Sequence, residues 1–333
     1  MELKYWTKEK LKPLTIEKSE VPILFLDSNI IIELKKAKEG KNENIYFEEY
    51  KKLLFLLENK QQEGKLYCAL GEQAYEIGGV EKKYSNVDFL HMLTKKVKLK
   101  SALEIEKNQL DRALLRYLKN YPVISINYMD GIQELIYSSK EISDEIHKGL
   151  DKIIPRLFYK ELREKKNKIA QGMNENKKSE KFQKDFFRQL VLEVTCEARY
   201  LSQSGDNSEI RQLFRYQMDE RIKEFLEKGY FQDQDIAHEI YLKFLNSFDF
   251  FQTPYIDIDR NISAYFCVMQ NKSKPSDFID QRNAAAFLPY VNIFVTDKAF
   301  CNCIKDLNID QRYKTIVYDV RDLKKLLQYI ENL

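Results

Sequence analysis

The sequence predicts an α/β protein in which a central parallel sheet is formed from both ends of the chain and a large all-helical insertion separates the two halves. Near both ends, short apolar runs alternate with amphipathic helical patterns, as in strand–helix units around a parallel sheet. Between them the pattern is almost entirely helical. Glycine (10) and proline (7) are sparse, which favours long helices over an all-β fold. We therefore expect three parts, which are residues 1–86, 87–250 and 251–333.

The first half of the predicted sheet begins with a strand that ends at an acid. Residues 22–26 are a continuous apolar run, as expected for a strand buried on both faces. The next residues, Asp27-Ser28-Asn29, offer N-caps for a helix over 30–36. The further elements expected in this half are a helix over 47–57, a strand over 66–70 and a helix that begins at 71.

The middle and the C-terminal part differ in pattern. In the middle, residues 122–126 are interpreted as a short connector, and the expected helices cover 103–118, 132–162 with a break at Pro155, 182–201 and 210–226. The C-terminal part returns to alternation, with helices over 280–288, 298–307 and 320–327 and strands over 292–296 and 315–318. Parallel strands of this kind should be joined by right-handed crossovers.

Aspartates follow predicted strands on both sides of the insertion. Asp27 follows the strand over 22–26, and Asp297 ends the strand over 292–296. Open α/β sheets form their active sites where the carboxyl ends of the strands meet. Several carboxylates without a histidine cluster nearby indicate hard oxygen ligands for Mg²⁺ or Mn²⁺. Each aspartate has an alternative interpretation, because it could serve only as the N-cap of the following helix.

Two further pairs of acids can reach the same edge. Asp277 and Asp280 are three residues apart at the start of a helix, a spacing that aims both at one cation. The alternative is that they complement the helix dipole. Glu72 and Glu76 lie one turn apart after the second strand. Glu76 is the preferred ligand, because it has apolar neighbours. The alternative for this pair is a solvated helix face.

Composition sets limits on the class of protein. The five cysteines are odd in number and mostly scattered, which does not describe a disulfide framework, and the three histidines are far apart. The formal net charge of +3 neither indicates nor excludes a nucleic-acid partner. No run approaches the ~18 apolar residues of a membrane span. The N-terminus lacks a signal-peptide core, so a cytoplasmic protein without a membrane partner is expected.

The acidic motifs resemble those of the PIN-domain nucleases. Leu26-Asp27-Ser28-Asn29-Ile30-Ile31 is similar to the opening motif of that family. Asp280-x-x-x-Ala284-Ala285, followed by Thr296-Asp297, is similar to the closing motif. The resemblance covers about residues 21–80 and 275–330. The chain departs from the family in its long helical middle, and in having no residue between the closing threonine and acid.

The resemblance implies a three-layer α/β/α domain that cleaves RNA with Mg²⁺ or Mn²⁺ as cofactor. Asp27 matches the first acid of the family, Glu76 (or Glu72) the helical glutamate, Asp280 the third acid and Asp297 the fourth. Asp277 could share the role of Asp297, since the spacing after Thr296 departs from the pattern.

Substrate contacts are expected from polar and basic residues near these acids. The candidates are Asn29, Thr296, Arg282 and Lys298, with Lys274 as a further phosphate contact. Basic clusters over 95–100 and 160–184 could also hold phosphates, although a charge run on a helix is usually a solvated face.

The function expected from the sequence is a metal-dependent endoribonuclease, in a toxin–antitoxin or phage-defence context. Family members work in such settings, so this context rests on association. One alternative keeps the site and changes the substrate to DNA. The other is a non-catalytic PIN-like scaffold whose helical part binds protein. An inhibitor or activator protein and self-association complete the expected partners.

Overall fold

The structure is a computed structural model, and it describes residues 12–41, 44–73, 77, 85–94, 96–135, 222–245, 247–269 and 274–333. Within these ranges the chain forms a six-stranded sheet with the order β6-β4-β3-β2-β7-β8. The strands are β2 (Ile23–Leu26), β3 (Tyr67–Leu70), β4 (Val97–Leu99), β6 (Ile132–Leu135), β7 (Ile293–Val295) and β8 (Ile316–Tyr318). Every neighbouring pair is parallel except β4 and β6. A separate parallel pair joins β1 (Leu14–Glu17) to β5 (Ile124–Asn127).

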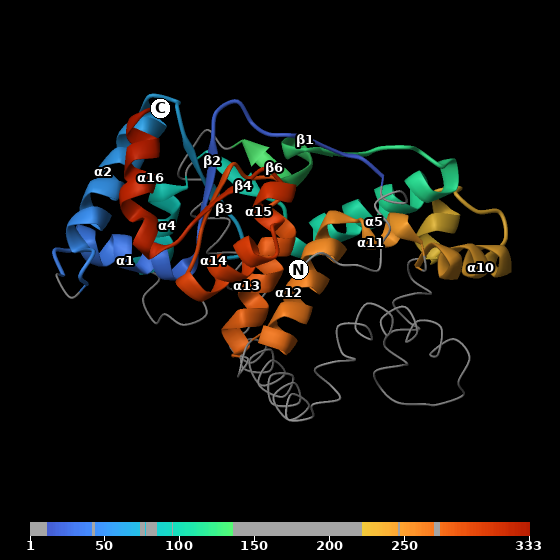
Figure 1. The fold of residues 1–333 in the computed structure, drawn as a ribbon. Coiled ribbons are helices and arrows are strands. Elements are labelled where there is room, and N and C mark those ends of the chain that lie inside the picture. The colour runs from blue at the N-terminus through green and yellow to red at the C-terminus, as the bar shows by residue number, and fades with distance from the viewer. Residues whose placement is uncertain are drawn as a thin grey trace.

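Helices flank the sheet on both sides (Figure 1). One layer contains α1 (Ser28–Lys38), α2 (Phe47–Gln62), α4 (Ser85–Leu93) and α16 (Leu323–Glu331). The other contains α5 (Ala102–Lys119), α12 (Pro254–Met269), α13 (Pro275–Phe287), α14 (Lys298–Asp306) and α15 (Ile309–Arg312). Further elements are α10 (Gln234–Leu245), α11 (Phe248–Phe251) and the 3₁₀ turns η2 (Tyr128–Gly131) and η3 (Val320–Asp322).

The side chains of β2 separate the core into two halves, because successive residues of a strand point to opposite faces. Leu24 and Leu26 pack in the cluster that contains α1, α2 and α16. Ile23 and Phe25 pack in the cluster that contains α5, α12 and α13. All four are at most 2% exposed. The continuous apolar run of the sequence is therefore explained by burial on both faces, which places β2 in the middle of three layers.

The predicted elements at the two ends of the chain are confirmed, except for the helix expected from 71, most of which lies outside the described residues. The expected strands appear as β2, β3, β7 and β8, and the expected helices as α1, α2, α13, α14 and α16. A central, mostly parallel sheet does draw its strands from both ends. Within the described ranges, no helix has both the length and the apolar character needed to cross a lipid bilayer.

The prediction of an all-helical middle is wrong for residues 97–135. The sheet continues past residue 87 with β4 and β6, and the predicted connector over 122–126 is part of β5, which pairs with β1. The helix over 103–118 is confirmed as α5. The helix expected from 132 begins instead with β6, and its remainder lies outside the described residues, as does the whole of 182–201. Strands of three or four residues are too short to show an alternation of apolar and polar residues. Whether such a segment forms a strand depends on the neighbouring strands with which it pairs.

Gly131 permits a close approach between η2 and the segment before β7. A Cβ at this position would lie 2.3 Å from Cγ of Tyr290, a buried side chain whose hydroxyl accepts a hydrogen bond from Gln109. We expect Gly131→Ala to lower the free energy of unfolding by about 2 kcal/mol, because the ring cannot move without repacking. Gly40→Ala is the comparison, since its methyl meets nothing within 4 Å but its φ of +74° is left-handed. That variant should lose only about 1 kcal/mol in urea unfolding. Equal losses would contradict the clash.

Candidate functional site

The two central strands create a switch point in the sheet. From β2 the chain proceeds to β3 and β4 on one side, and β7 and β8 lie on the other. In open α/β sheets such a point leaves a crevice outside the carboxyl ends of the strands, where ligands bind. Asp27 follows β2, and Thr296 and Asp297 follow β7. The structure thus brings together residues that are about 270 positions apart in the sequence.

Asp27 is held in place on three sides. Its backbone N–H donates to the carbonyl of Val295 at 2.9 Å. Its Oδ1 accepts from the backbone N–H of Ser28 at 2.7 Å, which makes Asp27 the N-cap of α1. The hydroxyl of Thr296 donates to Oδ2 at 3.4 Å, a long hydrogen bond. The capping alternative considered from the sequence is therefore correct in part, and it leaves Oδ2 turned towards the end of β7.

The pKa of Asp27 is raised to about 6, chiefly by burial and next by the nearby charge of Asp297, although the hydrogen bonds from Ser28 and Thr296 lower it. The side chain is only 4% exposed. No lysine or arginine in the described ranges forms an ion pair with it. Two nearby carboxylates without a cationic side chain between them repel, and a bound cation would relieve the repulsion. This donor set fits a hard divalent ion.

Asp297 is half-buried and also has a capping role. Its Oδ1 accepts from the backbone N–H of Phe300 at 2.9 Å, which fixes the first turn of α14. Although no residue separates it from Thr296, its charge acts directly on Asp27. The departure from the family pattern therefore does not move this acid away from the first one.

Asp277 and Asp280 lie on the first two turns of α13. The Oδ2 of Asp277 accepts from the backbone N–H of Lys274 at 2.7 Å in a capping box, so the helix-terminus alternative describes this residue. Asp280 is half-buried one turn later. Because α13 leads into β7 through a short loop, its first turns lie towards the carboxyl ends of the strands.

Of the two candidate glutamates, Glu72 forms structural contacts and Glu76 is not described. The Oε1 of Glu72 accepts from the backbone N–H of Ala102 at 2.9 Å and pairs with Nη2 of Arg282 at 3.1 Å. These contacts tie the end of β3 to α5 and α13, which gives Glu72 a structural role. Glu76 lies outside the described residues. Within the described ranges no three acidic, histidine or cysteine side chains are close enough together to hold a metal ion.

The residues predicted to contact the substrate differ in their exposure and in their partners. Asn29 and Lys298 are exposed on the first turns of α1 and α14. Thr296 is buried and donates to Asp27, so its contact is with the acid. Arg282 is partly exposed and paired with Glu72. Lys274 is exposed before α13. Residues 160–184 lie outside the described ranges.

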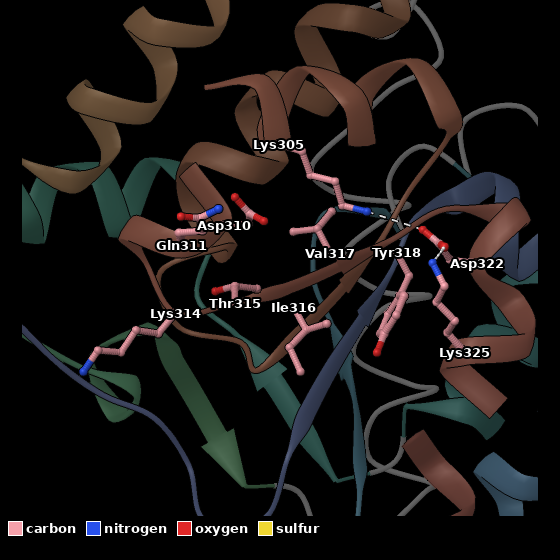
Figure 2. A pocket seen from close by; sticks show the side chains of 10 residues that line it. All are labelled: Lys305, Asp310, Gln311, Lys314, Thr315, Ile316, Val317, Tyr318, Asp322 and Lys325. Atoms are coloured by element: carbon pink, nitrogen blue, oxygen red, sulfur yellow. Dashed lines mark hydrogen bonds and ion pairs between the residues drawn. The ribbon is translucent and has the colours of Figure 1, made fainter. Parts of the chain in front are cut away.

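A groove of about 520 Å³ runs along the outer edge strand β8, and its lining does not include Asp27, Thr296 or Asp297. Figure 2 shows Lys305 and Lys325 both pointing to Asp322, with ion-pair distances of 3.3 and 2.8 Å. Ile316 in this edge strand is 40% exposed. Lysines beside an exposed strand edge discourage pairing with other chains. We interpret the groove as a protected edge rather than as part of the site.

Comparison of the chain with protein-family models, with curated proteins and with solved structures found no match.

Proposed function

We propose that this protein is a Mg²⁺- or Mn²⁺-dependent endoribonuclease with a PIN-like site at the carboxyl ends of β2 and β7. The observation that carries the proposal is the buried Asp27, whose pKa is raised to about 6 by burial and by Asp297, and which has no cationic partner in the described chain. Perturbed carboxylates at a switch point are typical of functional sites. The similarity of the acidic motifs to the family supports the same assignment.

In this proposal Asp27 and Asp297 hold the cation through carboxylate oxygens, and Asp280 and Glu76 complete the acidic set. Asp277 and Glu72 serve the ends of helices instead. When bound, the cation lowers the pKa of a water molecule and polarises the scissile phosphate. Thr296 orients the carboxylate of Asp27. Lys298, exposed on the first turn of α14, contacts a phosphate of the substrate.

The alternative of a non-catalytic scaffold is favoured by one observation, which is that the contacts of Glu72 and Asp277 are structural. Binding of Mn²⁺ separates the two functions. A ligand that binds only the folded state raises the melting temperature by mass action, and a scaffold without a cation site shows no such response.

The nuclease proposal is tested by incubating the purified protein with labelled single-stranded RNA and the matching DNA, in Mg²⁺, in Mn²⁺ and in EDTA. Asp27→Asn and Asp280→Asn are assayed beside the parent, and Lys325→Asn at the β8 groove is the matched surface control. We expect RNA cleavage that needs the cation, is lost by at least 100-fold in both site variants and is unchanged in the control. Cleavage of DNA alone would change the substrate. No cleavage of either polymer would contradict the proposal.

A further inference from the structure

Asn283 on α13 is a buried amide that has no hydrogen-bond partner. Its side chain is 2% exposed, and both Oδ1 and Nδ2 lack a partner. Buried side-chain polar atoms in folded proteins nearly always have one, so an exception requires an explanation. The neighbouring positions 284–287 are apolar and fully buried. An apolar side chain would suit this helix face, so packing alone does not explain an asparagine here.

The sheet-facing side of α13 carries Asn283. One turn further along, the ring of Phe287 lies 5.1 Å from that of Phe25 in β2. Asn283 and Phe287 are four residues apart and therefore share a helix face. The opposite side of the helix is identified by Gln281, which donates to Asp259 and Ser263 of α12.

Asn283 stands level with Asp27. The side chains of β2 alternate between the two faces of the sheet. Asp27, two residues after Phe25, is therefore on the same face as Phe25, which is the side of α13. Two strand residues advance by about 6.6 Å towards the carboxyl end. Helix α13 runs in the opposite direction, and the four residues back from Phe287 to Asn283 cover about 6 Å. The Phe25–Phe287 contact therefore sets Asp27 and Asn283 at the same height, where the proposed cation is held.

The chemistry of the amide fits that position. The carboxamide oxygen of asparagine is a hard, uncharged ligand for divalent cations. Asp27 and Asp297 already repel one another, so a third carboxylate at this height would raise the repulsion, whereas an amide adds an oxygen without a charge. The Nδ2 group can donate to a carboxylate or to a water of the cation's shell.

We propose that Asn283 is an uncharged oxygen ligand, through Oδ1, of the divalent cation held by Asp27 and Asp297. This inference rests on the proposed function and extends its site to a residue that the acidic motifs do not include.

The test measures the melting temperature of the whole chain at increasing Mn²⁺ concentration. It compares the parent with Asn283→Leu, Asn283→Asp and Asp27→Asn. We expect Asn283→Leu to raise the Mn²⁺ concentration at half-response by about tenfold or more. In EDTA its melting temperature should equal or exceed that of the parent, because an orphaned amide is removed. Asn283→Asp retains an oxygen and should keep the half-response within about threefold of the parent. Gln281→Leu is the matched control on the other side of α13, and it should lower the melting temperature in EDTA without moving the half-response.

The outcomes separate this inference from the proposed function. A parent response that Asn283→Leu retains at the same Mn²⁺ concentration, while Asp27→Asn abolishes it, overturns the ligand role and leaves the nuclease site intact. No Mn²⁺ response in the parent overturns both. If Asn283→Leu does not fold, Asn283→Ala is measured against the same two results.

Discussion

Asp27→Asn should make the metal-free protein more stable at neutral pH. The pKa of Asp27 is raised to about 6 in the folded state by burial and by Asp297, from an ordinary value of 3.8. Ionising a carboxyl group under these conditions costs about 1.4 kcal/mol per unit of pKa difference. We therefore expect the variant to gain about 3 kcal/mol in urea unfolding at pH 7 in EDTA. Asparagine can still accept the capping hydrogen bond from Ser28, so the helix start is retained.

The pH dependence of this gain has a fixed sign. A raised folded-state pKa means that the native protein binds the proton more tightly than the unfolded chain does. The contribution of Asp27 is therefore fully present below about pH 4 and is lost as the pH rises through about 6. The difference in unfolding free energy between variant and parent should grow between pH 4 and pH 7 and then level off. A variant that is no more stable than the parent at pH 7 would contradict the buried, unpaired carboxylate.

Lys18→Met should be among the most destabilising single changes in the chain. The Nζ atom of Lys18 donates to the carbonyl oxygens of Leu288, Pro289 and Val291 at 2.6 to 3.1 Å, and to the hydroxyl of Thr315 at 2.8 Å. These contacts fasten the segment before β2 to the loop between α13 and β7. Methionine fills a similar volume but leaves the carbonyl oxygens without this donor. We expect a loss of about 3 kcal/mol in the free energy of unfolding.

Lys314→Met is the matched control for that variant. Burial, and next the charge of Lys314, lower the pKa of Lys18 to about 7. Lys314 is exposed, so its removal should change the unfolding free energy by less than about 0.5 kcal/mol. Similar losses in the two variants would show that the loop does not depend on the Lys18 contacts.

The centre of the sheet could be predicted from the sequence because the apolar run and the capping residue there both indicate a strand followed by a helix. The apolar run before Asp27 is long enough to indicate burial on both faces, and the acid itself caps the next helix. The same combination of a short strand and a capping aspartate recurs at Asp297. Both aspartates could be placed at one edge because parallel strands share it. The effect of Asp297 on the pKa of Asp27 could be recognised only from the structure.

Other features depend on partners that are distant in the sequence. Strand β4 has three residues, of which only Val97 and Leu99 face the core, and its neighbours β3 and β6 define it. The Lys18 contacts span about 270 positions and leave no local pattern. Asn283 did leave a signal, since it is the one amide directly before a run of alanines. A ligand role for Asn283 could be proposed only once its burial and its lack of a hydrogen-bond partner were known.

A cation site at the ends of β2 and β7 can be tested by counting the Mn²⁺ ions bound per chain. Titration calorimetry gives this number for the parent, Asp27→Asn and Asp297→Asn. We expect the parent to bind one or two ions and Asp27→Asn to lose at least one, while the variant is more stable than the parent in EDTA. Asp297→Asn should weaken binding by about tenfold or more, because one of the two proposed carboxylate ligands is removed. A parent that binds no Mn²⁺, or an Asp27→Asn variant that binds as the parent does, would contradict a cation site at the ends of β2 and β7.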